Sequence, residues 1–259
     1  MRSLYGNKSL SNSDLLKNAI KKGLKVAYLD IETSPYLVWT YGIFKTTISP
    51  TQIEQDTMIT SAVLLYEDNK VPIVMNWNPN IKDKDKQLLK DLMKHIRDAE
   101  VIIMQNGDKF DAPIIQDRLF KVGLEPLKNI ITLDTLLWSK RSFKRASHSL
   151  NYRSKVCNLG GKIRQDMSDC IDVAKGNDTK QKQRTKYNIK DVLDTRTIFW
   201  KELDYYSLPA SALNILSKYQ DAIPICIKCA AKRQKRYDIS QTPQYNICRS
   251  CGYKWSRCK

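Results

Sequence analysis

The chain has 259 residues, with 44 Lys or Arg against 27 Asp or Glu and a formal net charge of +17. Its 42% hydrophobic content and sparse glycine and proline exclude disordered, collagen-like and low-complexity proteins. No apolar run approaches the ~20 residues of a membrane-spanning helix, so we expect no membrane partner. A charge this positive indicates a polyanionic partner, with nucleic acid as the leading candidate.

The first predicted elements are a short surface helix over 14–22, which ends at Gly23, and four strands. The strands are predicted over 25–31, 36–44, 58–66 and 71–77. The first 25 residues lack the apolar core of a signal peptide, so we expect an unsecreted protein of the cytoplasm (the host cytoplasm if viral) with reduced cysteines. A mitochondrial presequence is the alternative interpretation of this basic, Ser-rich start.

The rest of the main body alternates helices and strands. Helices are predicted over 83–98, 112–122, 148–157 and 182–205, and buried strands over 101–104 and 130–133. The polar stretch 160–179 predicts a mobile loop. Strands first, then helix and strand in alternation, predict an α/β domain with a mixed sheet.

Acidic residues stand at three places beside apolar runs. Asp30 and Glu32 end the first strand and, two residues apart, point to one face, although a solvated strand end would look the same. Asn106-Gly107-Asp108-Lys109-Phe110-Asp111 follows the strand 101–104, and a capped helix start is its alternative interpretation. Tyr187 and Asp191 share a helical face, as would a core tyrosine beside a solvent-facing aspartate.

Jointly these segments resemble the motifs of the DEDD family of 3′→5′ exonucleases: D-I-E-T at 30–33, N-G-x-x-F-D at 106–111 and Y-x3-D at 187–191. The tyrosine is similar to that of the DEDDy branch, which includes the proofreading domains of family-B DNA polymerases. The resemblance covers about residues 24–205 and implies a ribonuclease H-like α/β fold, a mixed sheet flanked by helices. No polymerase domain follows, so we expect a free-standing exonuclease or a detached subunit.

The resemblance also implies roles for these residues. Asp30, Glu32, Asp111 and Asp191 would hold two Mg²⁺ or Mn²⁺ ions, hard cations that prefer oxygen ligands. Tyr187 would orient the attacking water, because tyrosine with its ordinary pKa near ~10 is a poor general base at neutral pH. Candidate substrate contacts are Thr33, Asn106, Phe110, Lys186, Lys232, Arg233 and Arg236. Phe110 is equally interpreted as a packing residue, and the basic run 232–236 as a solvated loop tip.

Five of the seven cysteines fall in the last 34 residues. Cys226 with Cys229 and Cys248 with Cys251 form two C-x2-C pairs that are 18 residues apart, the spacing of a structural site for one Zn²⁺. Two disulfides or four unligated thiols are the alternatives. The segment resembles a zinc ribbon, and its nine Lys or Arg against two Asp or Glu suit a nucleic-acid grip.

The predicted organisation is therefore an N-terminal helical extension (1–23), a ribonuclease H-like exonuclease domain (24–219) and a zinc ribbon (220–259). The predicted function is metal-dependent hydrolysis of phosphodiester bonds at the 3′ end of single-stranded DNA, with a polymerase or another replication protein as a second candidate partner. Polarity, and DNA rather than RNA, come wholly from the family. An RNA-directed exonuclease and a catalytically silent nucleic-acid-binding or adaptor protein remain alternatives.

Overall fold

The structure is a computed structural model that describes residues 11–44, 46–81, 83–127, 130–160, 166–208, 210–219, 239–241, 245–248 and 252–256. The chain divides into two compact units, one drawn from 26–137 and 145–198 and the other from 1–25, 138–144 and 199–259. The three domains predicted from the sequence stay a prediction. None of the helices in the described ranges is long and apolar enough to cross a membrane.

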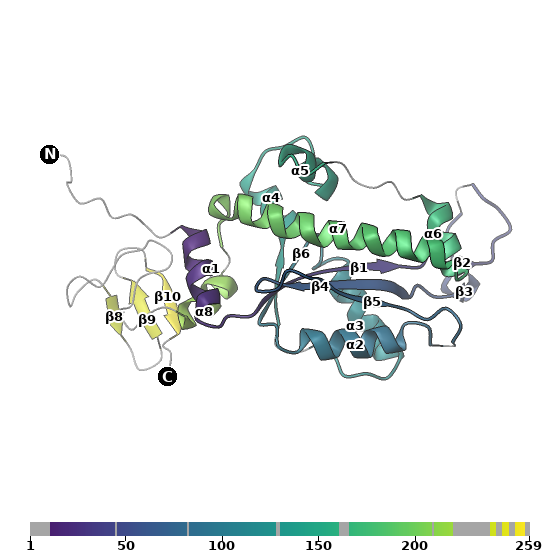
Figure 1. The fold of residues 1–259 in the computed structure, drawn as a ribbon, viewed down its shortest axis with the longest axis horizontal. Coiled ribbons are helices and arrows are strands. Elements are labelled where there is room, and N and C mark those ends of the chain that lie inside the picture. The colour runs from purple at the N-terminus through teal and green to yellow at the C-terminus, as the bar shows by residue number, and fades with distance from the viewer. Residues whose placement is uncertain are drawn as a thin grey trace. The chain divides into compact units, whose positions relative to one another are not determined.

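The larger unit is built on a five-stranded mixed sheet with the order β5-β4-β1-β6-β7 (Figure 1). On one side of β1 (Val26–Thr33) the sheet is antiparallel, with β4 (Ile59–Tyr66) and β5 (Ile73–Asn76). On the other side β6 (Val101–Met104) and β7 (Ile131–Asp134) run parallel to it. The predicted mixed α/β sheet is thereby confirmed.

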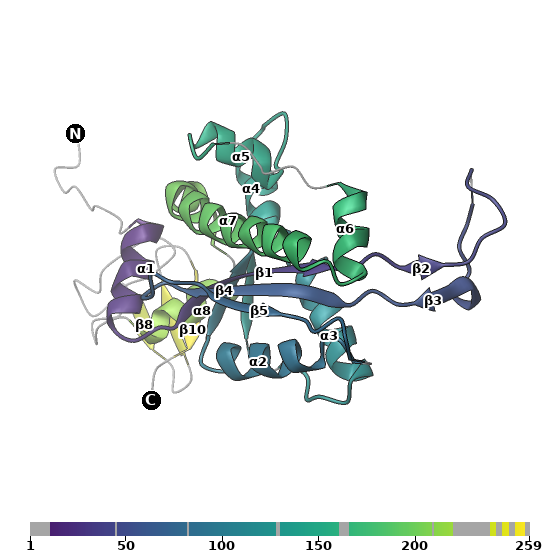
Figure 2. The same ribbon diagram turned by 45° about the vertical axis from the view of Figure 1, so that its right-hand side comes forward.

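Helices cover both faces of this sheet (Figures 1 and 2). One face carries α2 (Lys86–Ile96) and α3 (Asp111–Lys121), and the other carries α7 (Asp178–Glu202). The remaining helices that begin in this unit are α4 (Thr135–Ser142), α5 (Leu150–Val156) and α6 (Met167–Ala174). The main core lies beneath α2 and α3, because their apolar residues recur at helical spacing and pack against alternate residues of β1.

Two predictions for this unit are wrong in part. Of the predicted strand 36–44, only β2 (Leu37–Val38) is extended and paired, with β3 (Ile53–Gln55), and the 3-10 helix η1 (Pro50–Gln52) precedes β3. Its apolar residues are exposed instead of interior, so an apolar run alone misled the prediction. The predicted mobile loop 160–179 instead contains α6 and the start of α7, while 161–165 lie outside the described residues. Asp166 and Asp169 begin α6 with a reciprocal capping box.

The smaller unit contains α1 (Asn12–Lys21), the ends of α4 and α7, the 3-10 helix η2 (Leu203–Tyr205) and α8 (Ala210–Lys218). The Asn12 side chain donates hydrogen bonds to the carbonyl oxygens of Leu203 and Tyr206, which ties α1 to η2. A three-stranded antiparallel sheet follows, made of β8 (Ile239–Gln241), β9 (Tyr245–Cys248) and β10 (Lys254–Ser256).

The predicted zinc ligands fall largely outside the described part of this unit. Cys226, Cys229 and Cys251 lie outside the described residues, and Cys248 ends β9 without a described side chain. The zinc site therefore stays a prediction.

A candidate metal site between β1 and α7

The first two carboxylates owe their direction to the alternation of side chains along β1. Leu29 and Ile31 are buried in the core beneath α2 and α3. Because successive side chains of a strand point to opposite faces, Asp30 and Glu32 face the side of the sheet that α7 covers (Figure 1). Both remain half-buried.

Asp191 of α7 completes a cluster with these two residues. One carboxylate oxygen from each of Asp30, Glu32 and Asp191 lies within 4.8 Å of the others. Three carboxylates this close repel one another unless cations lie nearby, and oxygen ligands suit hard divalent cations. Tyr187, 5% exposed, precedes Asp191 by one helical turn and so shares its face of α7.

Asp111 joins the site from the first turn of α3. Its Oδ1 accepts a hydrogen bond of 3.0 Å from the backbone amide of Ile31, which lies between the two β1 carboxylates. Strand β6 pairs with β1 only as far as Tyr28, so the side chain of Asp111 satisfies an amide that no strand reaches there. The motif residues predicted as ligands thus converge from two helices and one strand.

Burial governs the protonation of Asp111. The residue is 2% exposed, and desolvation raises its pKa from 3.8 to about 7. The nearby carboxylates of Glu32 and Asp134 raise the pKa further, whereas the amide hydrogen bond from Ile31 opposes the shift. A bound divalent cation would favour the charged form, so the residue fits a metal site better than an empty one.

A buried arginine neutralises part of the cluster. Nη2 of Arg184 donates to Glu32 Oε2 at 2.7 Å and to the carbonyl oxygen of Thr33 at 2.8 Å, and Nη1 lies 2.9 Å from Cys170 Sγ. Arg184 is only 5% exposed. The sequence placed it among several basic residues around the third motif, and its seven-residue spacing from Asp191 was the signal that it shares the same face.

Asn188 is a site residue that sequence reasoning missed. It is fully buried beneath α7. With its amide oriented to satisfy both ends, its nitrogen donates to Asp30 Oδ2 and to the Asp30 carbonyl oxygen, each at 3.3 Å. The residue next to the tyrosine in the third motif therefore holds the first carboxylate in place.

The second motif forms a tight turn before α3. Asn106 has a φ of 65°, and its amide donates to Asp134 Oδ1 at 3.1 Å. Asp134 also accepts from the amides of Asp108, Leu136 and Leu137, so it caps α4, the role favoured from the sequence. Gly107 is required by close packing, because an added Cβ would lie 2.3 Å from Met104 Cβ.

The predicted substrate contacts have varied positions. Thr33 ends β1 with its carbonyl oxygen bound to Arg184. Phe110 is 41% exposed at the start of α3, so it is not a core residue, and Lys186 is exposed on α7. Lys232, Arg233 and Arg236 lie outside the described residues.

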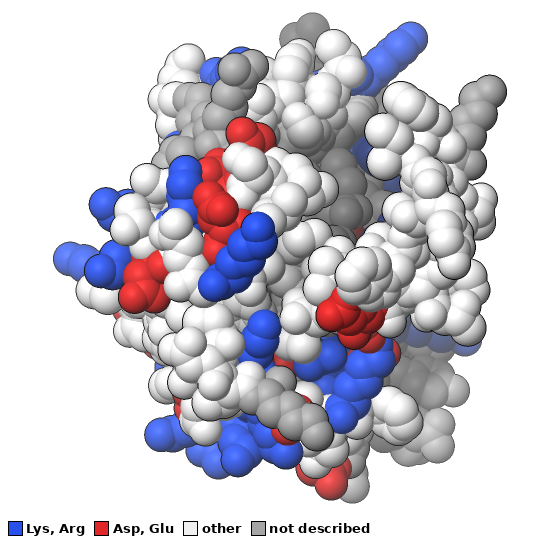
Figure 3. Space-filling view, turned by 90° about the vertical axis from the view of Figure 1, so that its right-hand side faces the viewer, with Lys and Arg blue, Asp and Glu red and all other residues white. Residues whose placement is uncertain are grey.

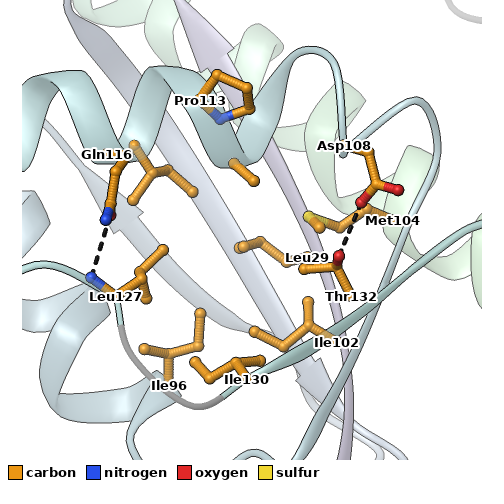
Figure 4. A pocket seen from close by; sticks show the side chains of 12 residues that line it. Leu29, Ile96, Ile102, Met104, Asp108, Pro113, Gln116, Leu127, Ile130 and Thr132 are labelled. Atoms are coloured by element: carbon orange, nitrogen blue, oxygen red, sulfur yellow. Dashed lines mark hydrogen bonds between the residues drawn. The ribbon is translucent and has the colours of Figure 1, made fainter. Parts of the chain in front are cut away.

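An apolar cavity of about 420 Å³ lies on the opposite face of the sheet, between α3 and strands β6 and β7 (Figure 4). At its ends Thr132 donates to Asp108 Oδ1 at 2.8 Å, and the Leu127 amide donates to Gln116 Oε1 at 3.1 Å. Leu29 lines it, and the neighbouring Asp30 points the other way. The cavity is therefore separate from the carboxylate cluster.

Comparisons with known proteins agree with this arrangement. A protein-family model described as the RNase_H superfamily matches residues 27–201, a range that contains every carboxylate of the site. DNA polymerase III PolC-type from Ureaplasma parvum serovar 3 (strain ATCC 700970) is 42% identical over 71 residues. That match covers 27% of this chain but 5% of the polymerase, so the similarity is to a small part of a much longer protein.

Proposed function

Because the chain belongs to the RNase_H superfamily, we propose that it is a metal-dependent exonuclease that removes nucleotides from the 3′ end of single-stranded DNA. The observation that carries this proposal is the convergence of oxygens from Asp30, Glu32 and Asp191 within 4.8 Å. The resemblance of the three motifs to DEDDy exonucleases supports the 3′→5′ direction. The similarity to part of a DNA polymerase supports DNA as the substrate.

Asp30, Glu32, Asp111 and Asp191 would hold two Mg²⁺ or Mn²⁺ ions. Bound there, such ions would lower the pKa of a water ligand and offset the charge that develops on the phosphate. The chain itself keeps the ligands in position through the Ile31 amide on Asp111, as well as through the side chains of Arg184 and Asn188.

Tyr187 would position the attacking water through its hydroxyl. It is buried one helical turn before Asp191, on the face of α7 that meets the cluster. A buried side chain keeps few rotamers, so its hydroxyl can be held in one place.

For the C-terminal segment we propose a zinc ribbon with Cys226, Cys229, Cys248 and Cys251 as ligands. Its C-x2-C spacing and its excess of basic residues support a grip on nucleic acid or a docking piece for a replication protein. Metal analysis of the purified chain should then give one zinc per molecule, and a zinc-free chain would contradict the ribbon.

The proposed activity is tested with a 5′-labelled single-stranded oligonucleotide in Mn²⁺ or in EDTA. We expect a ladder of products shortened from the 3′ end in Mn²⁺ only. Asp30→Asn should slow it at least a hundredfold, on the order of the several kcal/mol that metal-ion catalysis supplies. Asp98→Asn, at a carboxylate whose side chain is 74% exposed, is the matched control and should leave the rate unchanged.

Each alternative has its own outcome in this assay. Internal fragments without a 3′ ladder would indicate an endonuclease. A ladder on RNA alone would indicate an RNA-directed enzyme. No product from the wild-type chain under any divalent metal would indicate a silent binding or adaptor protein.

A further inference from the structure

A hairpin with uncovered aromatic side chains projects from the larger unit (Figures 1 and 2). We call it the aromatic arm and define it as residues 36–44 and 46–55. Among the described residues, seven of the 17 exposed large hydrophobics fall within it: Tyr36, Leu37, Trp39, Tyr41, Ile43, Phe44 and Ile48. An apolar patch this concentrated marks an interaction site.

The aromatic arm has defined structure. Leu37 and Val38 pair with residues of β3, the Trp39 amide donates to the Gln52 carbonyl oxygen at 2.9 Å, and Gln52 Nε2 donates back to the Trp39 carbonyl oxygen at 2.9 Å. At its base, Ser34 exchanges backbone and side-chain hydrogen bonds with Met58. The exposed rings are thus presented by a paired backbone.

The aromatic arm begins where the carboxylate cluster ends. Glu32 and Tyr36 are four residues apart on an extended chain, which limits the distance between their Cα atoms to roughly 14 Å. In the space-filling view the arm forms an uncharged ridge on the right, with Lys and Arg side chains over the lower part of the same face (Figure 3). A molecule held at the cluster therefore lies within reach of both aromatic rings and cations.

We propose that the aromatic arm is a stacking platform for the bases of single-stranded nucleic acid whose end occupies the carboxylate cluster. This inference rests on the proposed function. Aromatic faces stack on any base without hydrogen-bond readout, so the platform would tolerate all sequences. Four of the seven exposed residues are aromatic, and their continuity with the cluster favours a nucleic acid over a protein partner.

Binding is measured apart from hydrolysis, by fluorescence anisotropy of a labelled single-stranded 20-mer in EDTA. Trp39→Ala and Phe44→Ala, at side chains that are 71% and 86% exposed, should each weaken binding about 5- to 150-fold, the equivalent of about 1–3 kcal/mol per stacked base. Phe120→Ala, at an aromatic that is 83% exposed on α3, is the matched control and should bind like wild type.

A second substrate separates this inference from the proposed function. The p-nitrophenyl ester of thymidine 5′-monophosphate carries one base and should need the cluster alone, so the arm variants should hydrolyse it in Mn²⁺ within twofold of wild type. Wild-type chain that hydrolyses neither substrate would refute the proposed function, while the anisotropy result would still decide on the arm.

Two outcomes would overturn the stacking platform. One is unchanged affinity for the 20-mer in both arm variants. The other is a wild-type dimer in sedimentation that becomes a monomer in the Trp39→Ala, Phe44→Ala double variant while oligonucleotide affinity stays the same. The second result would assign the arm to protein association.

Discussion

Replacing Asp111 with asparagine should stabilise the metal-free protein at neutral pH. The wild-type carboxyl has a pKa of about 7 in the folded chain, against an ordinary pKa of 3.8 in the unfolded chain, because burial disfavours its charge. Asparagine carries no charge to desolvate, and its Oδ1 can still accept the hydrogen bond from Ile31. The variant therefore removes an electrostatic cost and keeps the main contact.

The direction of the pH dependence follows from proton linkage. A folded-state pKa that is raised contributes stability below pH 3.8, and this contribution is lost as the pH rises towards 7. Three pKa units at 1.36 kcal/mol each give a cost on the order of 4 kcal/mol above pH 7. The free energy of unfolding of Asp111→Asn minus that of wild type should therefore be near zero at pH 3.5, grow with pH and level off above pH 7.

Urea titrations in EDTA at several pH values measure this difference. Asp98→Asn is the control, because its side chain is 74% exposed and should give a difference near zero throughout. Mn²⁺ should then stabilise the wild-type chain more than the variant, since the charged carboxylate gains a cation. A difference for Asp111→Asn that stays flat between pH 4 and pH 8 would refute the buried, proton-binding carboxyl.

Arg184→Ala should lower the free energy of unfolding by about 3–5 kcal/mol in EDTA, because it leaves Glu32 without its buried ion-pair partner. Mn²⁺ should raise the melting temperature of this variant more than that of wild type, and equal shifts would show that Arg184 and the metal do not share the carboxylate. Gly107→Ala should cost about 1–3 kcal/mol in the same urea titrations, because the new Cβ would lie 2.3 Å from Met104 Cβ. Gly42→Ala, where the nearest atom to an added Cβ is 3.9 Å away, is its control, and equal loss in the two variants would contradict the packing argument.

Local periodicity was enough to predict most of the secondary structure. Apolar runs located β1, β4 and β6, and helical spacing located α2 and α3 within a few residues of their ends. The same arithmetic placed Asp30 and Glu32 on one face, and Tyr187 with Asp191 on another. These predictions needed only the two- and 3.6-residue repeats of strands and helices.

Periodicity was misleading where burial depends on distant neighbours. The run 36–44 is as apolar as an interior strand, yet the described structure leaves most of its side chains exposed on the aromatic arm. The polar stretch that begins α6 was interpreted as a loop, although the capping box of Asp166 and Asp169 is a local signal for a helix start.

The amino-acid sequence alone determined which residues carry acidic chemistry and which face of its own strand or helix each one occupies, because both follow from neighbours a few positions away. Only the tertiary structure decided that α7 lies over β1, which brings Asp191 to Asp30 and Glu32. It also paired Arg184 with Glu32 across 152 positions and buried Asp111 against the Ile31 amide. Contacts between such distant positions depend on how whole elements pack, and a repeat within one element carries no record of its partner.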